Sequence, residues 1–482
     1  MIFWNVAGLK KKDREFWEYI EGFDIIGLCE TWVEEKEWER MKRNMSKKFE
    51  WKCQYAIREK CKGRAKGGII TGIRKEIEEI DIKEAVFVNG MQERRLRVEG
   101  EIWRIITVYN GEKMRTLRRE LEEMIEEREE EILCIGGDFN ARIGGEGKNY
   151  EGDNDEERQR SSKDGVINTE GKEFLGMLEE RGWEVGNGNM RGDEEGEWTY
   201  SGGRGTSVVD YMVVNREAWD RVIKLTIGER VESDHQPLEV EIRGGVERLE
   251  EEMQKKTKEV IQWDEESIKK YKEKAEEVEV EGEEVEDVWE NLKKAVEKSM
   301  VRKRITIRRR KIGEKDWWDE ECKRKKRGLK RTYKRWRMGK EGKEVYVKLR
   351  REFREMCRRK EEKRLENYEE EVRSAKTEEQ IWKIINKERK KRVPIEEDIK
   401  MEEWENHFMQ LLEGSKEDRR EEVERRSKEE DGELEIQDQE IEEQINNLKR
   451  RKAAGVDGIA GEAWKFSDGR IKGKLKEILK KV

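Results

Sequence analysis

The sequence has few histidines, no closely paired cysteines and no long hydrophobic run. Its 482 residues are 33% hydrophobic and 46% charged, and two of them are histidines. Ordinary soluble domains carry about a quarter of charged residues, so this composition is not that of one uniform globule. No apolar run approaches the roughly 18 residues that a membrane span requires, and the N-terminus lacks the pattern of a signal peptide. We therefore expect a soluble, intracellular protein that is long enough for two to four domains.

The cysteines argue against two common uses of this residue. They are Cys29, Cys53, Cys61, Cys134, Cys322 and Cys357. No C-x-x-C pair occurs among them, so the pattern suits a reducing compartment and predicts neither a disulfide framework nor a zinc site. Cys29 and Cys134 lie in apolar segments, where a buried thiol packs as a small hydrophobic side chain.

Most of the glycines and the clear strand-like runs lie in residues 1–243, which can therefore bury a core. Strands are expected at residues 1–6, 24–30, 51–57, 67–73, 80–88, 93–98, 101–109, 183–187, 197–201, 207–214 and 221–227, and from residue 238. Helices are expected up to about residue 22 and at residues 34–48, 114–125 and 170–181. Many strands for each helix predict an α+β protein built on packed sheets.

Residues 132–140, ILCIGGDFN, combine a buried strand with polar chemistry. Four apolar residues predict a short strand, which two glycines break before Asp138 and Asn140. The glycines allow close approach, and the two polar side chains should point the same way because extended residues alternate between faces. A rigid strand that ends in a carboxylate and an amide can position polar groups accurately.

Polar side chains end the other apolar runs as well. They are Asn5, Glu30, Tyr109, Asp210 and the pair Asp234 and His235. Taken singly, an Asp or Asn at a strand end is usually a turn or cap residue, and a lone tyrosine or histidine is more often structural. His235 follows Ser-Asp and precedes Gln-Pro at the foot of a strand, which favours a functional role. Strands that converge at one rim would hold these groups together.

Six motifs in the first half share one order with a known family. They are WNVAG (4–8), LCET (28–31), VY (108–109), GDFNARIG (137–144), SVVDY (207–211) and SDHQPL (233–238). Together they resemble the endonuclease/exonuclease/phosphatase superfamily, and within it the endonuclease of non-LTR (LINE-type) retrotransposons. The resemblance implies a four-layer α/β/β/α sandwich, with two packed mixed sheets flanked by helices. Two features depart from the family: Tyr109 is followed by Asn-Gly without the usual proline, and the first strand begins at residue 1.

The resemblance implies metal-dependent hydrolysis of phosphate esters. Glu30 is the expected ligand of Mg²⁺, with Mn²⁺ as an alternative, because a carboxylate suits a hard cation that keeps several waters. Asn5 would orient Glu30 or complete the metal shell, and Asp234 would support the metal or its waters.

The remaining motif residues would act on water and phosphate. Asp138 is expected to orient or deprotonate the attacking water, with Asn140 beside it on water and phosphate. Asp210 would fix the tautomer of His235 and raise its pKa, so that His235 can donate to the scissile phosphate. Tyr109 would hydrogen-bond to a phosphoryl oxygen. The sequence leaves the roles of base and acid open among Asp138, Asp210 and His235.

Substrate choice is expected to come from loops. Arg204 lies in the glycine-rich stretch SGGRG (201–205), where it could enter a DNA groove or simply form a hairpin turn. Arg64 and Lys66 form a second basic loop suited to phosphates. GRAKGGI (63–69) and GDEEGEWTY (192–200) look like additions of the retrotransposon type.

The second half is expected to contain three segments: an acidic helical linker at 244–300, a basic helical region at 301–400 and a C-terminal part at 401–482. The net charge of −8 argues against nucleic-acid binding by the whole chain, but runs such as RKRITIRRRK (302–311) are typical of such binding or of nuclear targeting. Paired, solvated helix faces are the alternative. Apolar stripes on both sides of Gly339 and Gly342 predict two helices with packing faces.

The C-terminal part resembles the start of a retrotransposon reverse transcriptase. WENHF (404–408) and LKRRKAAGVDGIAGEAWK (448–465) carry this resemblance, with Ala460 where proline is usual. No Tyr-x-Asp-Asp or Ala-Asp-Asp motif follows, so we expect a truncated fragment without polymerase activity.

These observations predict a Mg²⁺-dependent DNA endonuclease, and the resemblance implies nicking that leaves a 3′-hydroxyl for priming reverse transcription. The expected partners are a DNA substrate and, through the basic region, the RNA of the element, without a membrane. The nucleus is the favoured location over the cytoplasm. Two alternatives stay open: a phosphomonoesterase of the same superfamily, and an inactive retrotransposon remnant that only binds nucleic acid.

Overall fold

The fold was obtained as a computed structural model. It describes residues 1–58, 63–80, 87–88, 90–125, 131–147, 149–150, 157–158, 160–203, 205–244, 257–306, 312–388, 403, 406–408, 436–450, 452, 454–455, 457–467 and 469–481. The chain forms two compact units. Unit 1 combines Met1–Glu251 with Arg310–Ile381, and unit 2 combines Glu252–Arg309 with Trp382–Val482.

Unit 1 contains two mixed sheets. In spatial order the first is β16 (Val222–Ile227), β17 (Leu238–Ile242), β1 (Ile2–Asn5), β2 (Ile25–Cys29), β4 (Ile69–Arg74) and β3 (Phe49–Gln54). The second is β12 (Glu184–Val185), β15 (Asp210–Val214), β9 (Ile132–Asp138), β8 (Glu101–Tyr109), β7 (Met91–Val98) and β5 (Glu78–Ile80), with β6 (Phe87–Val88) also paired to β7. The pairs β1–β2 and β8–β9 are parallel, and the other neighbours are antiparallel.

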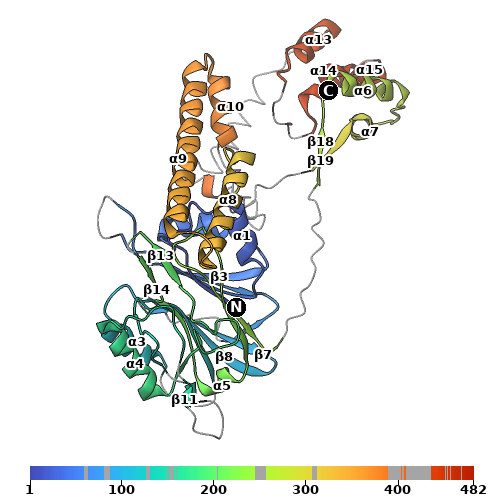
Figure 1. The fold of residues 1–482 in the computed structure, drawn as a ribbon. Helices are drawn as coiled ribbons and strands as arrows, with labels where there is room; N and C mark the ends of the chain where they lie inside the picture. The colour runs from blue at the N-terminus through green and yellow to red at the C-terminus, as the bar shows by residue number, and fades with distance from the viewer. Residues whose placement is uncertain are drawn as a thin grey trace. The chain divides into compact units, whose positions relative to one another are not determined.

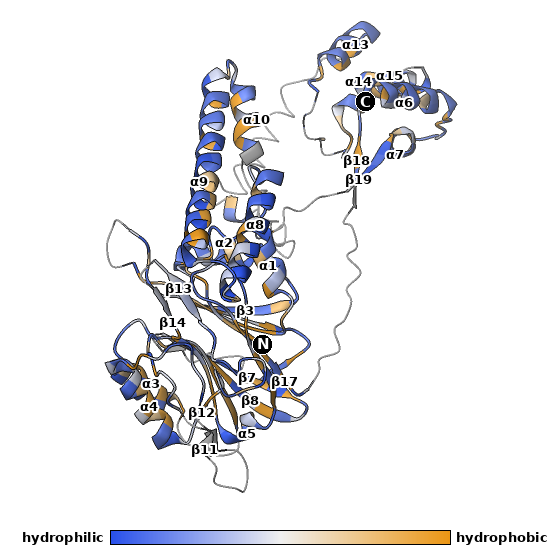
Figure 2. Ribbon diagram, viewed as in Figure 1, coloured by the Kyte–Doolittle hydropathy of each residue, from blue (hydrophilic) through white to orange (hydrophobic). Residues whose placement is uncertain are grey.

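The two sheets pack face to face around an apolar core. Phe3 and Leu238 of the first sheet share this core with Leu96, Cys134 and Met212 of the second. Because successive strand residues point to opposite faces, their neighbours in sequence face outward and form two further cores under the helices. Figure 2 shows the strands as mainly apolar and the helices as mainly hydrophilic on their outer sides.

Helices cover the outer face of each sheet (Figure 1). On the first sheet lie α1 (Arg14–Ile20) and α2 (Glu35–Lys42), and on the second lie α3 (Met114–Met124) and α4 (Thr169–Arg181). The predicted α/β/β/α sandwich is therefore confirmed. Smaller elements are β10 (Asn149–Tyr150), β11 (Glu157–Arg158), β13 (Tyr200–Gly202), β14 (Gly205–Ser207) and α5 (Arg216–Trp219).

Strand β9 corrects one expectation. The two glycines were expected to break the strand, but it runs through them to Asp138. A Cβ on Gly136 would lie 2.2 Å from the ring of Phe3 in the facing sheet. At Gly137, where φ is 142°, a Cβ would lie 2.1 Å from the carbonyl oxygen of Val108. The glycines thus allow close approach within the strand instead of ending it.

One expected strand is divided in the structure. Residues 207–214 form β14, which pairs with β13, and β15, which pairs with β9. Between them the backbone N–H groups of Val209 and Asp210 donate to Thr199 Oγ1, so the chain leaves the hairpin there before it joins the sheet. Of the expected strand at 80–88, Ile80 ends β5 and Phe87–Val88 form β6, and residues 81–86 lie outside the described part.

Unit 1 also includes α8 (Glu320–Arg337) and α9 (Lys343–Ser374), which run side by side (Figure 1). The two helices predicted around Gly339 and Gly342 are therefore present. Lys326 of α8 is buried, and its Nζ lies 2.5 Å from Asp13 Oδ2 and 2.7 Å from Glu232 Oε1. Burial alone would raise the pKa of Glu232, but nearby cations, Lys326 first, outweigh it and lower the pKa to about 2.

Unit 2 is a small, mainly helical body. It contains the hairpin of β18 (Thr257–Ile261) and β19 (Arg302–Thr306), with α6 (Glu265–Glu277), α7 (Val285–Ser299), α13 (Asp438–Asn447), α14 (Gly461–Phe466) and α15 (Arg470–Lys481). Tyr271 and Leu292 from the acidic segment share an apolar core with Trp464 and Ile471 from the C-terminal part. The functional division at 243, 300 and 400 stays a prediction. Helix α10 (Glu378–Glu388) spans the boundary between the units. None of the described helices is long and apolar enough to cross a membrane.

Candidate active site

Three of the predicted site residues lie in register at one end of the second sheet. Tyr109 is opposite Asp138 in the parallel pair β8–β9, and Asp210 is opposite Asp138 in the antiparallel pair β9–β15. Tyr109 and Asp138 end their strands, whereas Asp210 begins its strand. A row of three functional groups therefore crosses three adjacent strands, and the hydrogen-bonded sheet holds it in place.

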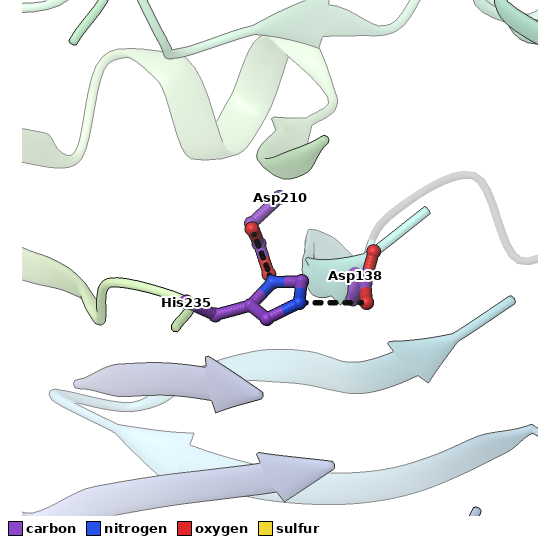
Figure 3. Close-up of side chains that lie close together, drawn as sticks. All are labelled: Asp138, Asp210 and His235. Carbon is purple, nitrogen blue, oxygen red and sulfur yellow. Dashed lines mark hydrogen bonds and ion pairs between the residues drawn. The ribbon is translucent and has the colours of Figure 1, made fainter. Parts of the chain in front are cut away.

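His235 completes this row from the segment that leads into β17 of the first sheet. Its Nδ1 lies 3.0 Å from Asp210 Oδ1 and 2.9 Å from Oδ2. Its Nε2 lies 3.9 Å from Asp138 Oδ2, so the ring stands between the two carboxylates (Figure 3). Asp138 is 1% exposed, Asp210 2% and His235 9%. The predicted Asp210–His235 pairing is observed, while its part in catalysis stays a prediction.

Burial and charge shift both pKa values in this cluster. Burial alone would lower the pKa of His235, but the carboxylates of Asp210 and Asp138 outweigh it and raise the pKa to about 10. Burial, and then the charge of Asp210, raise the pKa of Asp138 to about 7, against the opposing effects of His235 and Asn5. Near neutral pH the ring is therefore an imidazolium: its Nδ1–H donates to Asp210, and its Nε2–H faces Asp138.

Asn5 connects the first sheet to this cluster. It ends β1, and its Nδ2 donates to Asp138 Oδ2 at 2.8 Å, while its Oδ1 accepts from the N–H of Ala7 at 3.1 Å. The sequence predicted that Asn5 would orient Glu30 or complete the metal shell. In the structure the amide nitrogen of Asn5 donates to Asp138, and a role in the metal shell stays a prediction. Asn5 therefore orients the carboxylate at the centre of the row.

Glu30 follows β2 and faces Tyr109 across the two sheets. The hydroxyl of Tyr109 donates to Glu30 Oε1 at 2.5 Å. Burial, and then the charge of Glu30, raise the pKa of Tyr109 well above its usual range, so the phenol stays protonated. Glu30 has a φ of 50°, in the left-handed region that is uncommon for residues other than glycine.

Asn140 also has a φ of 50°, and it corrects a second expectation. Because β9 ends at Asp138, strand alternation does not extend to Asn140 and does not set the direction of its side chain. The N–H of Asn140 donates to Asp138 Oδ1 at 2.9 Å, and its Nδ2 donates to the carbonyl oxygen of Asn110 at 2.9 Å. Left-handed residues held in place at Glu30 and Asn140 are typical of functional sites.

The residues expected to contact DNA are Arg64, Lys66 and Arg204, and the structure describes the first two. Arg64 lies over the ring of Trp32, with its Cζ 4.3 Å from the ring centroid. Lys66 forms a β-bridge with Ile57. The loop of Arg64 and Lys66 lies beside the Glu30 segment, since the N–H of Trp32 donates to the carbonyl oxygen of Gly67. Arg204 lies outside the described residues.

Asp234 supports the cluster, together with Trp4 and Tyr200, for which the sequence predicted no role. The carbonyl oxygen of Asp234 accepts from the N–H of Ser201 at 2.8 Å. Trp4 Nε1 donates to the carbonyl oxygen of His235 at 2.8 Å, and the ring of Tyr200 lies 4.9 Å from that of His235. Trp4 lies in the motif WNVAG and Tyr200 in the motif GDEEGEWTY. Membership of these motifs is the sequence signal that could have identified the two residues.

The donor atoms of the site suit a hard divalent cation. Asp138, Asp210 and His235 each offer one ligand atom within 4.8 Å of the others, a spacing that could hold a metal ion. The half-buried carboxylate of Glu30 is a second candidate, because hard divalent cations such as Mg²⁺ prefer carboxylate and water oxygens.

Part of the chain matches a known family. Residues 103–239 match the family model described as endonuclease-reverse transcriptase. This range includes Tyr109, Asp138, Asn140, Asp210 and His235. Over these residues the match confirms the resemblance to the endonuclease/exonuclease/phosphatase superfamily. Comparison with curated proteins finds no match.

Solved structures that are similar to this chain include an endonuclease domain, an AP endonuclease and a 3′ phosphatase. The endonuclease domain of TRAS1, a telomere-specific non-LTR retrotransposon, is 16% identical over 50% of this chain and 97% of that chain, with a TM-score of 0.35. The AP endonuclease LMAP from Leishmania major is 16% identical over 51% of this chain and 87% of that chain, with a TM-score of 0.40. The 3′ phosphatase NExo from Neisseria is 15% identical over 50% of this chain and 98% of that chain, with a TM-score of 0.32.

Proposed function

We propose that this chain is a Mg²⁺-dependent DNA endonuclease that cuts a phosphodiester bond and leaves a 3′-hydroxyl. One observation carries the proposal: the in-register row of Tyr109, Asp138 and Asp210, completed by His235, lies within the segment that matches the endonuclease family. By resemblance, the 3′-hydroxyl would prime reverse transcription at the cut.

Hydrolysis needs a water that is oriented and deprotonated beside the phosphorus. Asp138 suits this task, because Asn5 and the N–H of Asn140 fix its carboxylate and its pKa is raised to about 7. A general base works best when its pKa lies near the working pH, because a substantial fraction is then ionised and still binds a proton well. Asp138 is therefore our choice for the base that the sequence left open.

His235 suits a different task on the same phosphate. It is cationic near neutral pH, and Asp210 fixes the ring through Nδ1, so Nε2–H can donate to a phosphoryl oxygen. The hydroxyl of Tyr109 can turn from Glu30 to a second oxygen. Glu30, with Asn5 and Asp234 in support, would hold Mg²⁺, which when bound would neutralise charge on the phosphoryl oxygens.

The test is nicking of supercoiled plasmid by the purified full chain with Mg²⁺, with EDTA as the blank. Asp138→Asn and His235→Gln should each lower the rate by roughly 10²- to 10⁴-fold, as expected for a proton-transfer residue. His407→Gln is the matched control, because His407 is the second histidine of the chain and is exposed. Extension of the nicks by a DNA polymerase would report the 3′-hydroxyl.

Equal nicking by the wild type and both site variants would refute the assignment. Release of inorganic phosphate from a phosphomonoester, with the plasmid left intact, would identify a phosphatase instead. Salt-sensitive DNA binding without either reaction would identify an inactive binding protein.

A further inference from the structure

A cavity of about 390 Å³ lies between helix α9 and strand β13 within unit 1. Its helical wall carries Arg350, Arg351, Arg354 and Arg358, with one carboxylate, Glu355. Arginines four residues apart share one helix face, so three of the four form a continuous stripe. Residues 201–203, Ser-Gly-Gly, form the opposite wall. We call this site the arginine cavity.

Arg350 is buried in the arginine cavity with unsatisfied donors. It is 9% exposed, and its Nη1 donates to the carbonyl oxygen of Ser201 at 3.3 Å. Its Nε and Nη2 have no hydrogen-bond partner among the described residues. A buried guanidinium that leaves donors unpaired is costly, so these donors are available to an acceptor that enters the cavity.

The positive charge of the arginine cavity is not cancelled locally. Arg351 and Arg354 are exposed and form no ion pair with a described residue, although Arg358 on the next turn approaches Glu362 at 3.8 Å. Desolvation, and then the charge of Arg350, lower the pKa of Arg354, while Asp234 opposes them. Neighbouring guanidinium groups that repel each other are stabilised by an anion that they share.

Strand β13 connects the arginine cavity to the candidate active site. The ring of Tyr200 lies 4.9 Å from that of His235, and the N–H of the next residue, Ser201, donates to the carbonyl oxygen of Asp234 at 2.8 Å. Gly203, two residues after Ser201, has open space where a Cβ would be, so the backbone there is accessible. Ser201, which lines the cavity, therefore directly follows Tyr200, whose ring lies beside that of His235.

We propose that the arginine cavity binds backbone phosphates of the DNA strand on one side of the bond that is cut. Each strand of a duplex carries one phosphate for roughly every 3.4 Å of its axis, so a strand seated at His235 brings the next phosphates to β13 and α9. The guanidinium fork matches phosphate oxygens in pairs. This inference rests on the proposed function. It makes α9 part of the substrate-binding surface.

The test compares two double variants of the full chain with equal loss of charge. Arg351→Ala/Arg354→Ala removes the exposed part of the stripe, and Arg359→Ala/Lys363→Ala removes two exposed cations of α9 that do not line the cavity. Binding of a fluorescent DNA duplex is measured in EDTA over a range of salt concentrations. The first variant should bind roughly tenfold more weakly. Its salt dependence should also be shallower by about 0.9 in log K against log salt for each phosphate that it no longer neutralises. The second should resemble the wild type.

Equal affinities and equal salt slopes for the two double variants would overturn the inference, whatever the nicking activity. An effect on binding of an RNA hairpin, with DNA binding unchanged, would overturn the assignment to DNA. If the wild type fails to nick but its DNA binding depends on Arg351 and Arg354, the proposed function is wrong and the assignment of the arginine cavity to DNA binding stands.

Discussion

Substitution of Asp210 by asparagine should move the titration of His235 more than any other single change in the site. The substitution keeps the size of the side chain and removes its charge, which lies 2.9 Å from Nδ1. The pKa of His235 is raised from an ordinary value near 6.5 to about 10. At 1.36 kcal/mol for each pKa unit this corresponds to about 5 kcal/mol in favour of the imidazolium. Burial acts in the opposite direction, so without Asp210 the midpoint should fall below about pH 8.

The chain is suited to this measurement because it contains two histidines. His407→Gln leaves His235 as the single ring signal in protein labelled with ¹³C-histidine, and EDTA keeps metal away. The wild-type ring should stay protonated from about pH 6 to pH 9, and Asp210→Asn should titrate within that range or below it. A wild-type midpoint near 6.5, or the same midpoint in both proteins, would refute our account of the pair.

Stability should follow the same titration with a defined sign. A pKa that folding raises contributes stability in full below the unfolded value near 6.5, and the contribution is lost as the pH rises through about 10. Urea unfolding of the wild type and Asp210→Asn should therefore differ most below about pH 6.5 and converge at alkaline pH. A difference that grows with pH would contradict this.

Three further predictions concern single residues. Tyr109→Phe should leave folding unchanged but slow nicking by roughly 10²-fold, because the phosphate loses a hydrogen-bond donor, and normal rates would argue against that role. Gly136→Ala should cost about 1–3 kcal/mol in urea unfolding, because its Cβ would overlap the ring of Phe3, whereas Gly176→Ala has open space and should not destabilise. Lys326→Met should destabilise unit 1 by about 1–3 kcal/mol, because buried Glu232 loses one cation but keeps Arg230, and the exposed Lys323→Met is the control. Because the pKa of Glu232 is lowered to about 2, this contribution is present above about pH 4.5 and is lost as the pH falls towards 2.

Much of unit 1 could be predicted from local sequence. Apolar alternation and helical spacing mark most strands and helices, because each pattern depends on a few neighbouring residues. The limits of the approach appear at Gly136 and Gly137, which look like strand breakers in sequence. They belong to the strand because Phe3 and Val108, far away in the chain, need the space of a side chain there.

The candidate site shows the same limit. The motifs identified Asn5, Asp138, Asp210 and His235 as polar groups at the ends of apolar runs. They did not predict that Asn5 bonds to Asp138, because that hydrogen bond joins the two sheets and spans more than a hundred residues. The arginines of α9 read as one more charged helix face, and their place beside β13 comes from packing within unit 1.

The sequence by itself therefore determined most strands and helices and the polar residues at the strand ends, from which the chemistry is proposed, because these depend on residue type and short spacing. Only the tertiary structure decided which polar groups meet, which pKa values shift and which arginines line the arginine cavity. Those properties depend on burial and on distances of a few ångströms between residues that are remote in sequence, and such distances exist only once the sheets and helices have packed.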